Sequence, residues 1–140
     1  MSQLKLIKIS STGEQLADGA AEWDAVLLPD HGLMFTATNV AEDAPHADCE
    51  AACKASRVAG FDDWAMPDID QLQLLIDRSR CSPAINTDFF RGIANDWYWT
   101  TTPAAWSSAS AWVVYFDLGS VDSGPRDYSG FALAVRRAGQ

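Results

Sequence analysis

The chain has 140 residues, of which 48% are hydrophobic and 11% aromatic, so one domain covering residues 1–140 can bury a core. Its net charge of -9 disfavours direct binding of nucleic acid, because phosphate contacts need a basic surface. No apolar run approaches the roughly eighteen residues of a membrane span, and no export signal is recognisable, so we expect a cytoplasmic protein without membrane contact.

Short strands are expected in the first third of the chain. Apolar residues alternate at 4–9, and further apolar runs occur at 25–28 and 33–38. Gly, Pro and Asp residues separate the three runs, as is typical of turns between strands.

Two helices follow. Pro45 marks the entry to a helix that we expect to end near Val58. The second helix is expected at 68–77, where Asp68 can cap the first turn and Gln71 stands at the spacing of a capping box.

The last third is expected to combine strands with long polar loops. Short runs rich in Trp, Tyr, Phe and Val predict strands at 97–101, 111–117 and 131–137. Two loops rich in Ser, Gly and Asp are expected between them, at 102–110 and 119–130. No linker or repeat divides the chain, so helices and strands must share one core, and the fold class is α+β.

Five blocks of sequence, in this order, resemble the bacterial and phage DUF1566 family: GFDDWAMPDIDQLQLLID, PAINTDFF, DWYWTTTP, AWVVYFDLGSV and GFALAVR. Family members typically carry Gly-x-x-x-Trp-Arg-Leu-Pro before a helix, a Tyr-Trp-Ser-Ser-Thr strand, an aromatic strand and a closing Val-Arg. The resemblance covers roughly 33–137. It implies a C-type-lectin-like fold, with two helices on a small twisted antiparallel sheet and long late loops that supply the binding surface. It also implies that the protein is located in a bacterial or phage-infected host cell, or alternatively that it is associated with a virion.

The residues at the most recognisable family positions are expected to form core and scaffold: Trp64, Pro67, Leu72, Trp99, Trp112, Phe116 and Arg136. Ala65 and Met66 stand where the family usually has Arg-Leu, so a salt bridge from that Arg is missing here. Ala134 stands where many relatives carry a cysteine, which puts a disulfide from Cys53 in doubt.

Three cysteines in a chain without an export signal indicate reduced thiols. His46, Cys49 and Cys53 could share a helix face, and Cys81 would complete a set of four zinc ligands. The tight cysteine pairs of structural zinc sites do not occur, however, so we expect neither a metal nor another cofactor.

The late loops are the expected binding surface. Trp106 lies among small residues without apolar periodicity, which favours an exposed anchor over a core residue. The second loop adds a cluster of polar and aromatic residues: Asp122, Arg126, Asp127 and Tyr128. Two purely structural interpretations stay open. Tyr128 would cover the sheet, and Arg126 would form a surface salt bridge with Asp122 or Asp127.

We therefore expect a non-enzymatic binding module for a protein or glycan. No nucleophile, metal or phosphate-binding motif of a known enzyme class is found, and the oligomeric state is not predicted. The alternative is an acidic inhibitor that binds the basic nucleic-acid groove of a host protein, and a phage is one source that would fit it. Its patch would come from a stretch without Lys or Arg, with these residues: Glu14, Asp18, Glu22, Asp24, Glu42, Asp43, Asp48 and Glu50.

Overall fold

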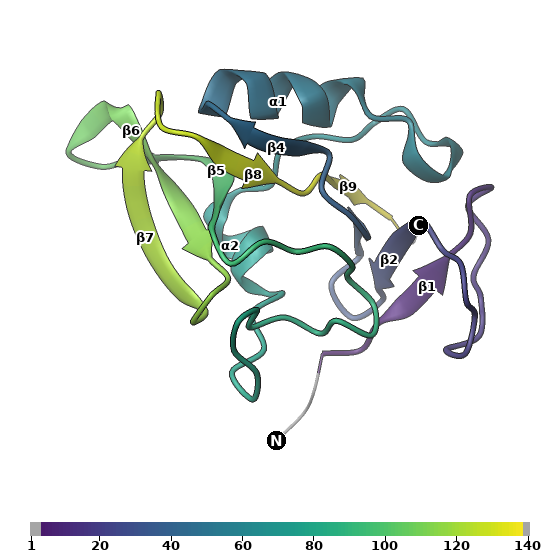
Figure 1. The fold of residues 1–140 in the computed structure, drawn as a ribbon. Coiled ribbons are helices and arrows are strands. Elements are labelled where there is room, and N and C mark those ends of the chain that lie inside the picture. Colours follow the sequence, from purple (N-terminus) through teal and green to yellow (C-terminus); the bar gives the residue numbers. More distant parts are fainter. Residues whose placement is uncertain (1–3, 139–140) are drawn as a thin grey trace.

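The computed structural model describes residues 4–138, which form a mixed α+β fold with mostly strands, two α-helices and two sheets (Figure 1). The expected α+β class is confirmed. No helix among the described residues is both long and apolar enough to cross a membrane.

The first sheet has four antiparallel strands in the order β1-β2-β3-β9. Its members are β1 (Ile7–Ile9), β2 (Ala25–Leu28), β3 (Leu33–Thr36) and β9 (Val135–Arg137). The strand expected at 25–28 is confirmed, whereas those expected at 4–9 and 33–38 are shorter in the structure. Pairing of β3 with β9 joins the start of the domain to its end.

The second sheet has five strands in the order β4-β8-β5-β6-β7. It contains β4 (Ala41–Ala44), β5 (Trp97–Ala104), β6 (Ser107–Tyr115), β7 (Ser120–Pro125) and β8 (Gly130–Ala132). The pairing of β5 with β8 is parallel and the others are antiparallel. β7 lies at one edge of this sheet and β4 at the other.

The two long late loops expected at 102–110 and 119–130 are wrong. The first is a hairpin in which β5 and β6 continue almost to each other, and β7 occupies half of the second (Figure 1). The strand expected at 131–137 is instead divided between β8 and β9, which belong to different sheets. Ser, Gly and Asp favour loops, but in these segments pairing with the neighbouring strands overrides that local preference.

Both expected helices exist, but both are shorter than expected. The helix α1 (His46–Ala55) ends before Val58 because Ser56 is extended, with a ψ of 144°, and a 3₁₀ turn at Val58–Gly60 follows. The helix α2 (Ile69–Gln73) begins with the expected capping box, in which Asp68 Oδ1 accepts from the Gln71 N–H at 2.8 Å.

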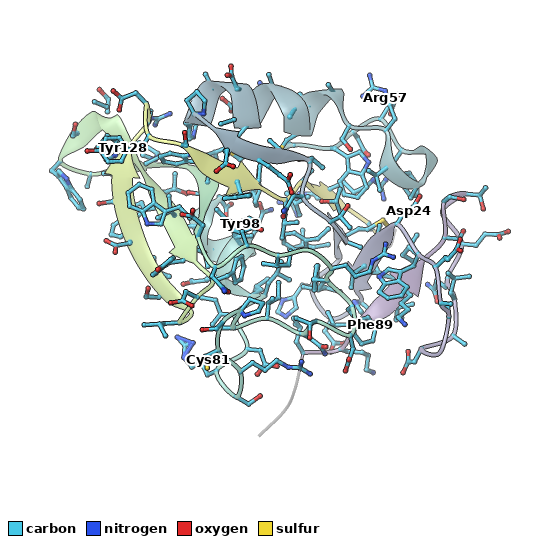
Figure 2. All side chains as sticks on the ribbon, in the orientation of Figure 1. Asp24, Arg57, Cys81, Phe89, Tyr98 and Tyr128 are labelled. Atoms are coloured by element: carbon cyan, nitrogen blue, oxygen red, sulfur yellow. The ribbon has the colours of Figure 1, made fainter. Side chains whose placement is uncertain are left out.

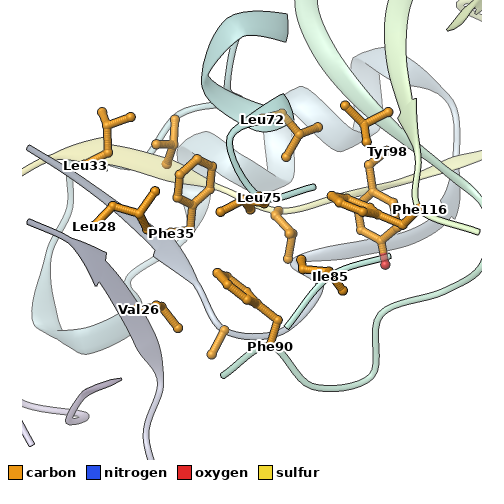
Figure 3. Packing of buried hydrophobic residues seen from close by; sticks show 14 of the residues in the cluster. Val26, Leu28, Leu33, Phe35, Leu72, Leu75, Ile85, Phe90, Tyr98 and Phe116 are labelled. Carbon is orange, nitrogen blue, oxygen red and sulfur yellow. The ribbon is translucent and has the colours of Figure 1, made fainter. Parts of the chain in front are cut away.

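Two hydrophobic clusters lie on opposite faces of the second sheet. The larger one joins the first sheet to α2 and to one face of β5 and β6, and Figure 3 shows Phe35, Leu72 and Tyr98 within it. The smaller cluster lies under α1, where Cys49 and Cys53 pack with Trp99. Successive residues of β5 therefore enter different clusters, as strand geometry requires.

Most of the scaffold residues implied by the family resemblance are buried as expected: Trp64, Pro67, Leu72, Trp99 and Phe116. Arg136 is bound to Asp63, with 2.6 Å between Nε and Oδ1, and its guanidinium lies over the Phe61 ring. Trp112 is the exception, because it remains partly exposed beside Trp106.

Candidate functional site

The register of β5, β6 and β7 decides which face of the second sheet each side chain occupies. Trp99 pairs with Val113, and Ala111 pairs with Gly124. Opposed residues of antiparallel strands share a face, and neighbours along a strand alternate. Trp112 therefore lies on the opposite face from these four residues.

Trp106 occupies the tip of the β5–β6 hairpin and is 67% exposed, which confirms the expectation of an exposed aromatic. Its ring packs edge to face against Trp112, with 5.6 Å between the ring centroids. The hairpin tip therefore carries a pair of indoles on a strand framework, and only the inner indole is partly buried.

One aliphatic residue of β7 lies on the same face of the sheet as the indole pair. Val121 pairs with Val114, and so it lies on the same face as Trp112 and diagonally across from it, at about 7–8 Å in an ideal ladder. Val121 is 38% exposed, and Leu118, in the turn between β6 and β7, is 69% exposed. We call Trp106, Trp112 and Val121 the Trp106 surface, and Leu118 lies beyond it, at the other end of β6 from the hairpin tip. Of these, sequence reasoning found Trp106 alone.

The hairpin that carries Trp106 and Trp112 has no charged side chain between Trp97 and Phe116, although the whole chain has a net charge of -9. Ser and Thr residues supply its polar groups instead. A surface of this composition offers apolar area and neutral hydrogen-bonding groups, and it exerts little long-range electrostatic attraction.

Tyr128 is separated from Trp106 by the sheet. Its ring stacks on Trp97 with an interplanar angle of 9° and a centroid distance of 6.0 Å. Trp97 lies against the Gly124 backbone, where an added Cβ would approach Cζ3 of the indole to 2.2 Å. We call Trp97, Gly124 and Tyr128 the Trp97 surface. Tyr128 is 57% exposed, yet its ring covers Trp97 of the sheet, in agreement with the structural interpretation.

Arg126, in the turn that carries Tyr128, is held by backbone and side-chain hydrogen bonds. Its N–H donates to the Ala109 carbonyl at 2.9 Å, and its own carbonyl accepts from the His46 N–H at 3.0 Å. Its Nη1 lies 3.4 Å from Nδ1 of His46. The alternative left open, a surface salt bridge with Asp122 or Asp127, is wrong, since none of the ion pairs among the described residues includes Arg126.

Asp122 and Asp127 are both exposed. Asp122 Oδ1 accepts from the Ser123 N–H at 3.1 Å. The register directs this N–H away from β6, because Arg126 and Ala109 form a hydrogen-bonded pair and such pairs recur at every second residue. Asp122 thus protects the free edge of β7, as charged residues on edge strands commonly do.

The acids of the predicted acidic patch lie on two segments of the fold. Four of its acids, from Glu14 to Asp24, lie between β1 and β2, whereas the other four lie on β4 and α1. Figure 2 shows Asp24 on the other side of the molecule from Tyr128, whose turn contacts the start of α1. The residues of the two groups are Glu14, Asp18, Glu22 and Asp24, and then Glu42, Asp43, Asp48 and Glu50.

The three cysteines are free thiols, as expected. Burial raises the pKa of Cys49 to about 11 and that of Cys53 to about 12. Cys81 is exposed and lies far from α1 (Figures 1 and 2). Across the described part of the chain, no three His, Cys, Asp or Glu side chains come together as a metal site.

Two hollows lie outside both surfaces. One, of about 420 Å³, has an apolar floor that includes Leu75 and Phe90. The other, of about 530 Å³, lies beside Phe61 and Arg136. Neither is lined by a residue that the sequence had marked for binding.

Comparison with known proteins supports the family resemblance at a coarser level than first inferred. The model of the Lcl C-terminal domain, a bacterial domain family related to the one expected, matches residues 17–136. No curated protein matches the chain. Because the match covers most of the chain, from before β2 into β9, the protein belongs to the Lcl C-terminal domain family.

Proposed function

We propose that this domain is a non-enzymatic binding module that recognises a protein ligand through the Trp106 surface. The observation that carries the proposal is the 67% exposure of Trp106 at the tip of a hairpin, beside the partly exposed Trp112. Exposed tryptophans with no role in the core are the residues that most often dominate binding energy at interfaces. We also propose a C-type-lectin-like fold, which is supported by the two helices on a mainly antiparallel β framework.

A protein ligand is favoured over a glycan by the aliphatic part of the surface. Val121 is 38% exposed and lies diagonally across from Trp112 on the same face of the sheet, so it extends the apolar area of the indole pair. Apolar areas of this kind become favourable contacts when a partner removes them from water. The partner surface is accordingly apolar and uncharged where it meets the hairpin.

The buried thiols support a non-enzymatic role. Cys49 and Cys53 have pKa values raised by burial to about 11 and about 12, so both remain protonated and poorly nucleophilic at neutral pH. His46 is buried, with its ring nitrogens directed at Thr100 and Arg126 rather than at either thiol.

A pull-down from host lysate tests the proposal, with wild type, Trp106→Ala and Tyr128→Ala as baits at low and high salt. Tyr128→Ala is the matched control, because it removes an aromatic of similar exposure from the other face. We expect a partner that is retained at high salt, lost with Trp106→Ala and kept with Tyr128→Ala.

The same experiment separates the acidic-inhibitor alternative. A nucleic-acid-binding partner released by salt and retained by Trp106→Ala would favour that alternative and contradict the proposal. Retention on immobilised glycans, without a protein partner, would replace the protein ligand by a carbohydrate.

A further inference from the structure

The start of α1 and the turn between β7 and β8 are joined through one buried histidine. His46 is the first residue of α1 and is only 3% exposed. Its backbone N–H donates to the Arg126 carbonyl at 3.0 Å. Its ring lies between β5 and the turn, with the Trp99 indole packed edge to face at 5.3 Å.

Both ring nitrogens of His46 are used, and this fixes its tautomer. Nε2 lies 2.8 Å from the Thr100 carbonyl, which can only accept, so Nε2 carries the proton. Nδ1 is then the unprotonated nitrogen, and it accepts from Arg126 Nη1 at 3.4 Å. The neutral imidazole therefore connects β5 to the turn.

The Arg126 guanidinium depends on this contact. Its Nε is buried without a hydrogen-bond partner among the described residues, and no carboxylate of that part of the chain forms an ion pair with it. Tyr128, two residues further along the turn, stacks on the Trp97 ring.

We propose that His46 and Arg126 form an acid-sensitive latch, in which protonation of His46 releases the β7–β8 turn and uncovers Trp97. An imidazolium has N–H groups at both nitrogens, so Nδ1 can no longer accept from Arg126. It also places a second positive charge next to the guanidinium. The latch adds a conformational response on the face of the sheet opposite the Trp106 surface.

The groups around His46 determine the sign of the response. Burial lowers the pKa of His46 from 6.5, the Thr100 carbonyl partly offsets this, Arg126 lowers it further and Glu50 opposes Arg126. The thiol of Cys49, one turn further along α1, has a pKa of about 11 and stays neutral. β5 presents the uncharged Trp99 ring, and the acids of β4 are exposed. The latch is therefore closed at neutral pH and opens only on acidification below the ordinary histidine range.

Acrylamide quenching of Trp97 between pH 8 and pH 4.5 tests the latch, with Trp97→Phe measured in parallel to isolate the Trp97 signal. We expect the quenching of Trp97 to rise reversibly on acidification while the far-UV circular dichroism stays unchanged. His46→Gln retains a donor and an acceptor but cannot titrate, so its Trp97 should stay protected. His31→Gln, at the exposed second histidine, should behave like the wild type.

A second variant keeps the test decisive if His46→Gln fails to fold. Arg126→Gln removes the positive charge beside the imidazole, so NMR titration should give a higher pKa for His46, and Trp97 should already be more accessible at neutral pH. Quenching that stays constant while His46 titrates would overturn the latch. So would an opening that persists unchanged in His46→Gln, or one that coincides with loss of the whole fold.

Discussion

The Trp97 surface and the Trp106 surface lie on opposite faces of the same strands, and each is built on a packed pair of aromatic rings. Trp97 is wedged between Gly124 and Tyr128 and touches the edge of Trp99, so its surroundings explain it structurally. Trp106 touches Trp112, remains 67% exposed and supports nothing further along the chain. The difference teaches that exposure alone does not mark a binding residue. The proposed binding surface rests instead on a large aromatic side chain that is exposed and has no packing role.

The largest expected difference is in stability. Trp97→Ala leaves a void between Tyr128 and Gly124, and we expect it to reduce the free energy of unfolding by about 3 kcal/mol. Trp106→Ala should change the same quantity by less than about 1 kcal/mol, because the indole is mostly in water. Urea unfolding of both variants measures the two values, and equal losses would remove the distinction between the surfaces.

A smaller effect is expected from adding one methyl group to β7. The new Cβ of Gly124→Ala would lie 2.2 Å from Trp97, so the ring must move, at a cost of about 1–3 kcal/mol. Ser123→Ala is the matched control, since Ser123 pairs with Trp112 on the other face and should cost about 0.5 kcal/mol or less. Thermal unfolding of the pair would contradict the packing if Gly124→Ala melted like the wild type.

Acid should weaken the Trp97 side through His46. The pKa of His46 lies below 6.5 in the folded chain, chiefly because of burial, whereas in the unfolded chain it lies near 6.5. Below pH 6.5 the unfolded chain therefore binds more protons than the folded chain. The free energy of unfolding decreases as the pH is lowered, until the pH is also below the folded-state pKa. His46→Gln should lose this part of the pH dependence in urea unfolding at a series of pH values. An unchanged slope would show that His46 does not contribute to it.

The smallest effect is expected at the edge of β7. Asp122→Ala frees the Ser123 N–H to water, so stability should change by no more than about 0.5 kcal/mol. Because the protected edge is lost, self-association should increase instead, which sedimentation velocity can measure. Asp127→Ala, which removes the same charge from the neighbouring turn, serves as the control.

The sequence was sufficient for the parts of the fold where local chemistry and burial agree. The capping box of Asp68 and Gln71 and the apolar run of β2 have the expected structure. The exposure of Trp106 was also predictable, because small residues flank it without apolar periodicity.

The strands expected at 97–101 and 111–117 exist as parts of β5 and β6, but the full extent of the late strands was not predictable, because its determinants are not local. β7 forms against β6, and Gly124 is required there by the Trp97 ring, far away in the sequence. The predicted binding cluster was separated for the same reason. Register placed Tyr128 and Arg126 on one side of the sheet and Trp106, with the unpredicted Val121, on the other.

The most direct test of the proposed function is the affinity of the captured partner for Trp106→Ala and for Tyr128→Ala, measured by calorimetry at two salt concentrations. We predict that Trp106→Ala weakens binding at least about 30-fold, corresponding to a hot spot of about 2 kcal/mol, and that the loss is independent of salt. Tyr128→Ala should remain within about threefold of the wild type. Equal weakening by both variants, or binding by Trp106→Ala that equals that of the wild type, would contradict recognition through the Trp106 surface.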